Sequence, residues 1–428
     1  MHRTEASGFV LVWIGAATAS WDVVGVDILG RTLKLTTVCF IAAIALFALA
    51  GRLTARRPTI PAGHRVTLWL ITALLAWLGL RSLVTDDVTS SLGGFASQLI
   101  PAGAPFVAVL LCHHRAAVIC RAFAYGMVAT SAAAIYEVVA KTNDWYWPTS
   151  YTAFAGGTHR AAGFSFEAAY FAAAAVAAIP ICLWFWNRRL GQAAMIAVLL
   201  GGIVAANARI VFVQVAVGFI VLSTLALWMR GPNRARLLRA LAAVSVLALL
   251  GVAAVAVVSP STAERVGERA MSIFDPDEAT SNSPRLEQFA AVADVIADHP
   301  VVGIGPARLG DELLARGEID DMTGDASFIT NNIWTQSLID GGAIALALQA
   351  AVVLSVIAGV RRRITLRQAG VLTSWLSFVL AAGLTVSNFW DTEPWILLGC
   401  YLGITAGASP PSEPSPSTPS TAPAGSVP

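Results

Sequence analysis

Three arginines stand in polar joints of an otherwise apolar chain: Arg160, Arg209 and Arg285. A guanidinium keeps its charge at physiological pH, and its forked donors match pairs of phosphate or carboxylate oxygens. Arg209 lies between two apolar runs in the short joint "NAR", where an unpartnered charge is costly. Arg209 is therefore either functional or an interfacial side chain that pins a hairpin. Structural alternatives also exist for Arg160 and Arg285, although a cation near a helix N-terminus opposes the helix dipole.

Carboxylates and imidazoles near these joints are candidates for accepting a proton. Glu167 in "GFSFEAAYF" lies just inside a predicted membrane span and is the best-placed carboxylate. Its structural alternative is an ion pair with Arg160 or Arg209. Asp340 stands near the start of another predicted span, and His299 ends a predicted helix, where capping is the commoner role.

Amides and aromatic rings supply candidate binding groups. Asn331 and Asn332, in "TNN", could donate hydrogen bonds to sugar or phosphate, or cap the helix that follows. Trp145, in "NDWYWPTSY", could stack on a sugar ring, or belong to the aromatic belt that membrane proteins place at the lipid interface.

The composition requires elements that cross a membrane. Hydrophobic residues make up 56% of the 428 positions and charged residues 13%, which excludes a soluble domain of this size. The cysteines and histidines show no metal-ligand or disulfide spacing, so no metal or cofactor is expected.

A window of roughly 20 apolar residues predicts an all-α polytopic membrane protein with about twelve transmembrane helices. The predicted spans are 8–28, 35–51, 65–83, 92–112, 119–140, 166–186, 191–206, 210–229, 238–258, 333–358, 369–388 and 394–408. Residues 1–258 then hold nine spans, 259–332 a large loop and 333–408 the last three spans, and the Pro/Ser-rich tail 409–428 is predicted to be disordered.

The loops are strongly segregated by charge. Alternate loops, such as "GRLTARRPTIPAGHR" and "RGPNRARLLR", carry most of the arginines and no acidic residue. Because basic loops stay in the cytoplasm, the pattern predicts a plasma-membrane protein with both termini cytoplasmic. The loop 259–332 then lies outside, where "SPRLEQFAAVADVIADHP" predicts a surface helix that ends at Pro300.

The stretch "HPVVGIGPARLG" that follows contains Gly303 and Gly305. A phosphate-binding glycine loop needs a preceding strand, and a Walker loop ends in Gly-Lys-Ser/Thr; neither condition is met. The glycines therefore predict a tight turn that folds the surface helix back onto the bundle.

The order of these segments resembles the O-antigen ligase and polymerase family of bacterial membrane glycosyltransferases. The matching segments are "RAAGFSFEAAYFAA", "NARIVFVQVAVG", "SPRLEQFAAVADVIADHPVVGIGPARLG" and "FITNNIWTQSLIDGGAIALAL", and the resemblance as a whole covers roughly residues 155–400. Where ligases carry a histidine before the re-entry asparagine, this chain has Asn331, which favours a polymerase-type or divergent member.

The resemblance implies a metal-independent transferase that moves a glycan from a polyprenyl-diphosphate donor to a glycan or lipid acceptor. Arg209, Arg285, Glu167 and Asn331 are then the catalytic candidates, and Arg160, Asn332, His299 and Trp145 the substrate-binding ones. The implied partners are membrane lipid and a polysaccharide-assembly complex, and no nucleic acid.

Two other classes of function fit a chain with this many predicted spans. A secondary transporter or lipid-linked-glycan flippase predicts repeats and polar residues at mid-membrane. A non-catalytic scaffold would tolerate loss of Arg209 and Glu167.

Overall fold

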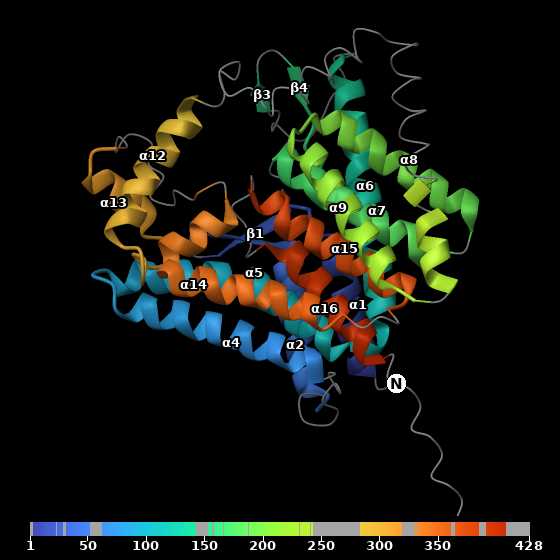
Figure 1. Ribbon diagram of the computed structural model, residues 1–428, viewed down its shortest axis with the longest axis horizontal. Coiled ribbons are helices and arrows are strands. Elements are labelled where there is room, and N and C mark those ends of the chain that lie inside the picture. The colour runs from blue at the N-terminus through green and yellow to red at the C-terminus, as the bar shows by residue number, and fades with distance from the viewer. Residues whose placement is uncertain are drawn as a thin grey trace, which may run out of the picture.

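The computed structural model describes the chain except residues 1–2, 23, 29–30, 52–61, 143–152, 156–157, 166, 187, 231, 240, 243–282, 319–329, 331, 361–363, 385–390 and 408–428. Helices dominate the described residues and form one bundle (Figure 1). The helices are α1 (Arg3–Ala17), α2 (Leu35–Leu49), α4 (Ala62–Leu83), α5 (Val88–Leu111), η1 (His113–Arg115), α6 (Ala116–Thr142), α7 (Ala168–Phe185), α8 (Arg189–Ala206), α9 (Ile210–Trp228), α12 (Ser283–Asp298), α13 (Leu309–Ala315), α14 (Ile333–Ala358), α15 (Leu366–Leu380), η3 (Ala382–Leu384) and α16 (Thr392–Gly407).

The all-α membrane fold predicted from composition is confirmed. Seven helices among the described residues are long and apolar enough to cross a bilayer, and α1 and α2 are shorter apolar helices. Large apolar side chains point out of the bundle, as lipid contact requires: Trp69 is 74% exposed and Leu227 is 70% exposed. The total of twelve spans stays a prediction, since the span 238–258 and the tail 409–428 lie mostly or wholly outside the described residues.

Some predicted spans are too long. The span 8–28 is wrong in its second half, because α1 ends at Ala17 and an antiparallel hairpin of β1 (Gly25–Ile28) and β2 (Arg31–Lys34) follows. The polar residues Asp22 and Asp27 interrupt the apolar run there. The span 369–388 is also shorter than predicted, as α15 gives way to η3 at residue 382. A second hairpin joins β3 (Ala153–Ala155) to β4 (Thr158–Arg160).

Helix α7 forms the centre of the part of the bundle that carries the candidate site. Its alanines at 172–175, 177 and 178 are fully buried. Small side chains let neighbouring helix backbones approach closely in a membrane, where hydrophobic burial gives little drive for helix association. Helices α6, α8, α9 and α15 accordingly all pack against α7.

Helix α14 is broken at Gly342, where φ is 66° and ψ is −164°. The break frees backbone groups that a regular helix would pair, and the chain after α12 pairs them instead. Ala343 N donates to Pro300 O at 2.9 Å, and Ile304 N donates to Ile339 O at 2.8 Å. The turn predicted at the glycines thus lies in the notch of a broken helix.

Two side chains of α4 secure this junction. Trp77 Nε1 donates to Gly341 O at 2.8 Å, and Arg81 Nη2 donates to Gly303 O at 2.9 Å. Gly303 has φ +67°, and a Cβ there would collide with backbone of α14. The predicted tight turn is confirmed, and it holds α12 and α13 against the ends of α4, α5 and α14 (Figure 1).

Candidate functional site

The segment from Arg160 to Glu167 joins the β3–β4 hairpin to α7 and carries two of the predicted residues. Arg160 ends β4 and is partly buried. The next residue, Ala161, donates its N–H to Ala205 O at 3.1 Å, in the last turn of α8. This bond places the start of the segment beside the joint that contains Arg209.

Arg209 occupies the tight connection between α8 and α9. Asn207 ends α8 in the left-handed conformation, with φ 45°, and Arg209 is the residue before α9. Its Nε atom is buried and has no hydrogen-bond partner among the described residues. A buried guanidinium nitrogen without a partner is costly, so this donor is available for an anionic ligand.

Glu167 and Arg209 lie at the same level of the bundle. Helices α7 and α9 run in the same direction, and Gln214 Nε2 donates to Ala173 O at 2.9 Å between them. Glu167 precedes Ala173 by six residues and Arg209 precedes Gln214 by five, so at 1.5 Å per residue both lie about 8 to 9 Å beyond this bond.

Glu167 stands at the N-terminal end of α7 and is partly buried. Glu167 therefore lies at the boundary of the predicted span 166–186, directly before the helix. The structural alternative, an ion pair with Arg160 or Arg209, is not formed among the described residues. Because no described cation pairs with it, this carboxylate is available to accept a proton, or a hydrogen bond from a sugar hydroxyl.

The start of α14 lies at the same end of the bundle. The short helix η3 contacts both α9 and α14, and its Gly383 lies against Ile333 at the start of α14. Asn332 is the N-cap of α14, and its Oδ1 accepts from Trp334 N at 2.9 Å and Thr335 N at 3.2 Å. The capping alternative is thereby confirmed for Asn332, whose side-chain amide nitrogen donates to none of the described residues.

A buried polar chain continues from this cap into α14. Asp340 is 1% exposed and accepts hydrogen bonds from Gln336 Nε2 at 2.8 Å and from Gln98 Nε2 of α5 at 3.3 Å. Gln336 in turn accepts from Thr330 N at 3.0 Å. These partners satisfy Asp340, which favours a structural role for it.

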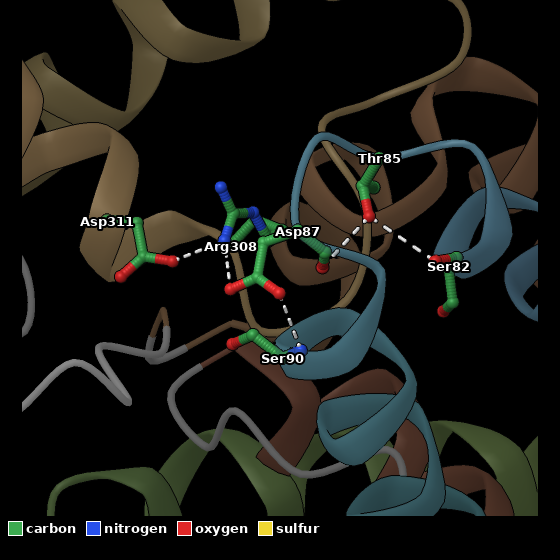
Figure 2. Close-up of polar contacts among 6 residues, drawn as sticks. All are labelled: Ser82, Thr85, Asp87, Ser90, Arg308 and Asp311. Atoms are coloured by element: carbon green, nitrogen blue, oxygen red, sulfur yellow. Dashed lines mark hydrogen bonds and ion pairs between the residues drawn. The ribbon is translucent and has the colours of Figure 1, made fainter.

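The region after α12 is docked on the α4–α5 turn through Arg308. Arg308 lies between Asp311, at 2.6 Å, and Asp87 of the α4–α5 turn, at 3.4 Å (Figure 2). Asp87 also caps α5 by accepting from Ser90 N at 3.0 Å. His299 is exposed directly after α12, and its carbonyl accepts from Gly303 N, so the backbone of His299 helps form the turn.

A charge cluster from distant parts of the sequence flanks the site. Lys34 Nζ lies 2.6 Å from Asp22 and 3.8 Å from Asp391, which precedes α16. Burial lowers the pKa of Lys34, but the carboxylates of Asp22, Asp391 and Glu393 outweigh that effect and raise the pKa above its ordinary value. Lys34 therefore remains a cation at any physiological pH.

The residues before Asp22 connect this cluster to the site. Ser165 Oγ donates to Ser20 O at 2.9 Å, and the rings of Trp21 and Phe164 lie 4.9 Å apart between centroids. The segment 160–167 thus has the arginine joint on one side and the Lys34 cluster on the other.

Replacing Lys34 by methionine is expected to destabilise the protein by about 1 to 3 kcal/mol, because removing one partner leaves carboxylates without their cation. The value is below that of a fully buried pair, since the Lys34 side chain is 33% exposed and partly screened. Thermal unfolding of the purified protein in detergent measures the effect. Lys34→Arg keeps the charge and should unfold near the wild-type temperature, whereas a Lys34→Met protein as stable as wild type would contradict a stabilising role.

Three predicted site residues are not placed. Asn331 and Trp145 lie outside the described residues, and Arg285 is described only by its backbone, as the third residue of α12. Within the described residues no group of three His, Cys, Asp or Glu side chains is placed to hold a metal ion. The structure therefore places Arg160, Glu167 and Arg209 at the same end of α7, α8 and α9, on the segment before α7 and the joint before α9.

Sequence reasoning missed Glu137 and the Lys34 cluster. Glu137 is 1% exposed on α6 and lies next to the segment 160–167. A single acid inside the predicted span 119–140 was a usable signal, since such residues need partners. Lys34 is one of two lysines in the chain, and nothing local identifies its carboxylate partners.

Comparison with known proteins agrees with the order of the motifs. The sequence model of the O-antigen ligase family matches residues 194–350. The match contains Arg209, Arg285, His299, Asn331 and Asn332, whereas Arg160 and Glu167 precede it. No curated protein matches the chain significantly. Residues 194–350 therefore carry the O-antigen ligase domain of this membrane protein.

Proposed function

We propose that this protein is a membrane glycosyltransferase that moves a glycan from a polyprenyl-diphosphate donor to a glycan or lipid acceptor in cell-surface polysaccharide assembly. The family supports a role in membrane glycan assembly, and the donor and the chemistry are inferred from the site. The observation that carries the proposal is Arg209, whose buried Nε has no partner among the described residues and which lies level with Glu167.

The residues fit displacement of a diphosphate. The acceptor oxygen forms a bond to the anomeric carbon while the bond from that carbon to the diphosphate oxygen breaks, and the diphosphate leaves with the bonding electrons. Arg209 and Arg160 hold the charge that develops on the leaving group, as guanidinium groups do for phosphate oxygens. Glu167 accepts the proton that the acceptor hydroxyl loses.

The other predicted residues complete this proposal. Arg285, in the first turn of α12, approaches the diphosphate from the loop that covers the site, and Asn331 is a further catalytic candidate. Asn332, His299 and Trp145 contact the glycan. The reaction takes place on the outer face of the plasma membrane, the side on which the arginine-poor loops are predicted to lie.

Deletion of the protein from its host is expected to cause lipid-linked oligosaccharide to accumulate as a single repeat unit, because the donor is made and no longer used. Mass spectrometry of the lipid-linked pool measures this. Wild-type protein should relieve the accumulation and Arg285→Ala, expressed at the same level, should not.

The same experiment separates the alternative functions. Relief by Arg285→Ala would remove this arginine from the mechanism. A strain that accumulates nothing would favour the secondary transporter or the non-catalytic scaffold over the transferase, and accumulation only in the inner leaflet of the membrane would identify a flippase.

A further inference from the structure

A buried carboxylate of α6, which the proposed transfer does not use, contacts the backbone directly after Arg160. Glu137 Oε2 accepts hydrogen bonds from Ala162 N and Gly163 N, both at 3.2 Å. Glu137 is 1% exposed and lies in a helix long and apolar enough to span the membrane. Burial of a carboxylate in a membrane span costs free energy, so we expect the hydrogen bonds of Glu137 to the backbone to serve a function.

The turn that Glu137 binds is shaped to fit α6. Gly163 has φ +60°, and a Cβ at that position would lie 2.6 Å from Thr130 O. Thr130 precedes Glu137 by seven residues, which is two helical turns, so both lie on the same face of α6. One face of α6 thus contacts the turn at two points. At Thr130 the two backbones are closely packed, and at Glu137 the carboxylate accepts two hydrogen bonds.

These contacts determine where Arg160 lies relative to Arg209. Residue 161 is bonded to Ala205 near the end of α8, and residues 162 and 163 are bonded to Glu137. Without the hydrogen bonds to Glu137, the end of β4 that carries Arg160 keeps its backbone hydrogen bond to α8. The position of Arg160 relative to Arg209 is then no longer fixed.

We infer that Glu137 is a positioning residue that holds Arg160 beside Arg209 for binding of the donor diphosphate. The inference rests on the proposed function. It predicts that Glu137 acts through Arg160 and contacts no substrate itself. A purely structural role predicts lost stability without a selective loss of diphosphate binding.

The test uses the full-length protein in lipid nanodiscs and farnesyl diphosphate, a short polyprenyl diphosphate, with binding measured by calorimetry. Glu137→Leu is expected to weaken binding about tenfold, since displacement of a binding group by about 1 Å has effects of this size or larger. Gly163→Ala disturbs the same turn from the other side and should weaken binding similarly. Glu137→Gln keeps an oxygen acceptor for the two N–H groups and should restore most of the affinity.

A double-mutant cycle decides whether the effect passes through Arg160. Glu137→Leu combined with Arg160→Ala should bind as weakly as Arg160→Ala alone, because the second change removes the group that the first displaces. Multiplicative losses, unchanged binding by Glu137→Leu, or a Glu137→Gln protein as weak as Glu137→Leu would each overturn the inference. Failure of the wild-type protein to bind farnesyl diphosphate would overturn the proposed function, and this inference with it.

Discussion

Replacing Arg209 by alanine is expected to reduce glycan transfer at least a hundredfold, because removal of one group that stabilises transition-state charge typically costs about 10² to 10³ in rate. Arg209 has a buried Nε that donates to no described residue, and it lies in the stretch that matches the O-antigen ligase domain. The measurement is the rate of transfer by purified protein with lipid-linked glycan extracted from a deletion strain.

Two variants make this result specific. Arg209→Lys keeps the charge but loses the forked geometry, so its activity should be low and above that of Arg209→Ala. Arg188→Ala removes an exposed arginine at the opposite end of α8 and should leave transfer unchanged. If Arg209→Ala retained full activity, the diphosphate would have to be held by other residues.

Gly342→Ala is expected to abolish activity and to lower the unfolding temperature. A φ of 66° with ψ of −164° is a region that only glycine adopts readily, and other residues there cost about 1 to 3 kcal/mol. An added Cβ would also overlap the backbone of Val301 and Val302, which cannot move without releasing the turn from α14. The transfer assay and thermal unfolding measure these two effects, and limited proteolysis between residues 299 and 318 reports release of the turn.

Gly317→Ala is the matched control. Gly317 also has a positive φ, of +72°, but no atom lies within 4 Å of an added Cβ. The free energy of unfolding of the control should fall by about 1 kcal/mol, the cost of backbone strain alone, and its activity should be unchanged. Equal behaviour of the two variants would show that docking of the turn contributes nothing beyond backbone strain.

Local patterns predicted the parts of the site that are local. Apolar runs on both sides of "NAR" place Arg209 between α8 and α9, and the Ser283-Pro284 start and Pro300 stop predict α12. The capping role of Asn332 follows equally from its position before an apolar run. Each of these depends on interactions within a few residues.

Features that depend on contacts between distant residues escaped prediction. The break at Gly342 is invisible to a hydropathy window, because the mean hydropathy over Ile333–Ala358 stays high, at 2.2, despite the polar residues before Gly341. The backbone groups freed by the break pair with residues 300–304, and no periodicity of the sequence predicts that pairing. Glu137 also escaped prediction, because its partners Ala162 and Gly163 lie on a segment that follows the end of α6.

The ion pairs of Lys34 connect early and late events in the synthesis of the chain. Asp22 and Lys34 enter the membrane with the first two helices, whereas Asp391 and Glu393 arrive with α16, after the whole O-antigen ligase domain has been made. A chain that stops before residue 391 would contain every arginine of the proposed site and lack two of the carboxylates around its lysine. Truncated chains of this kind are therefore expected to insert into the membrane and then to be degraded by the cell's membrane proteases.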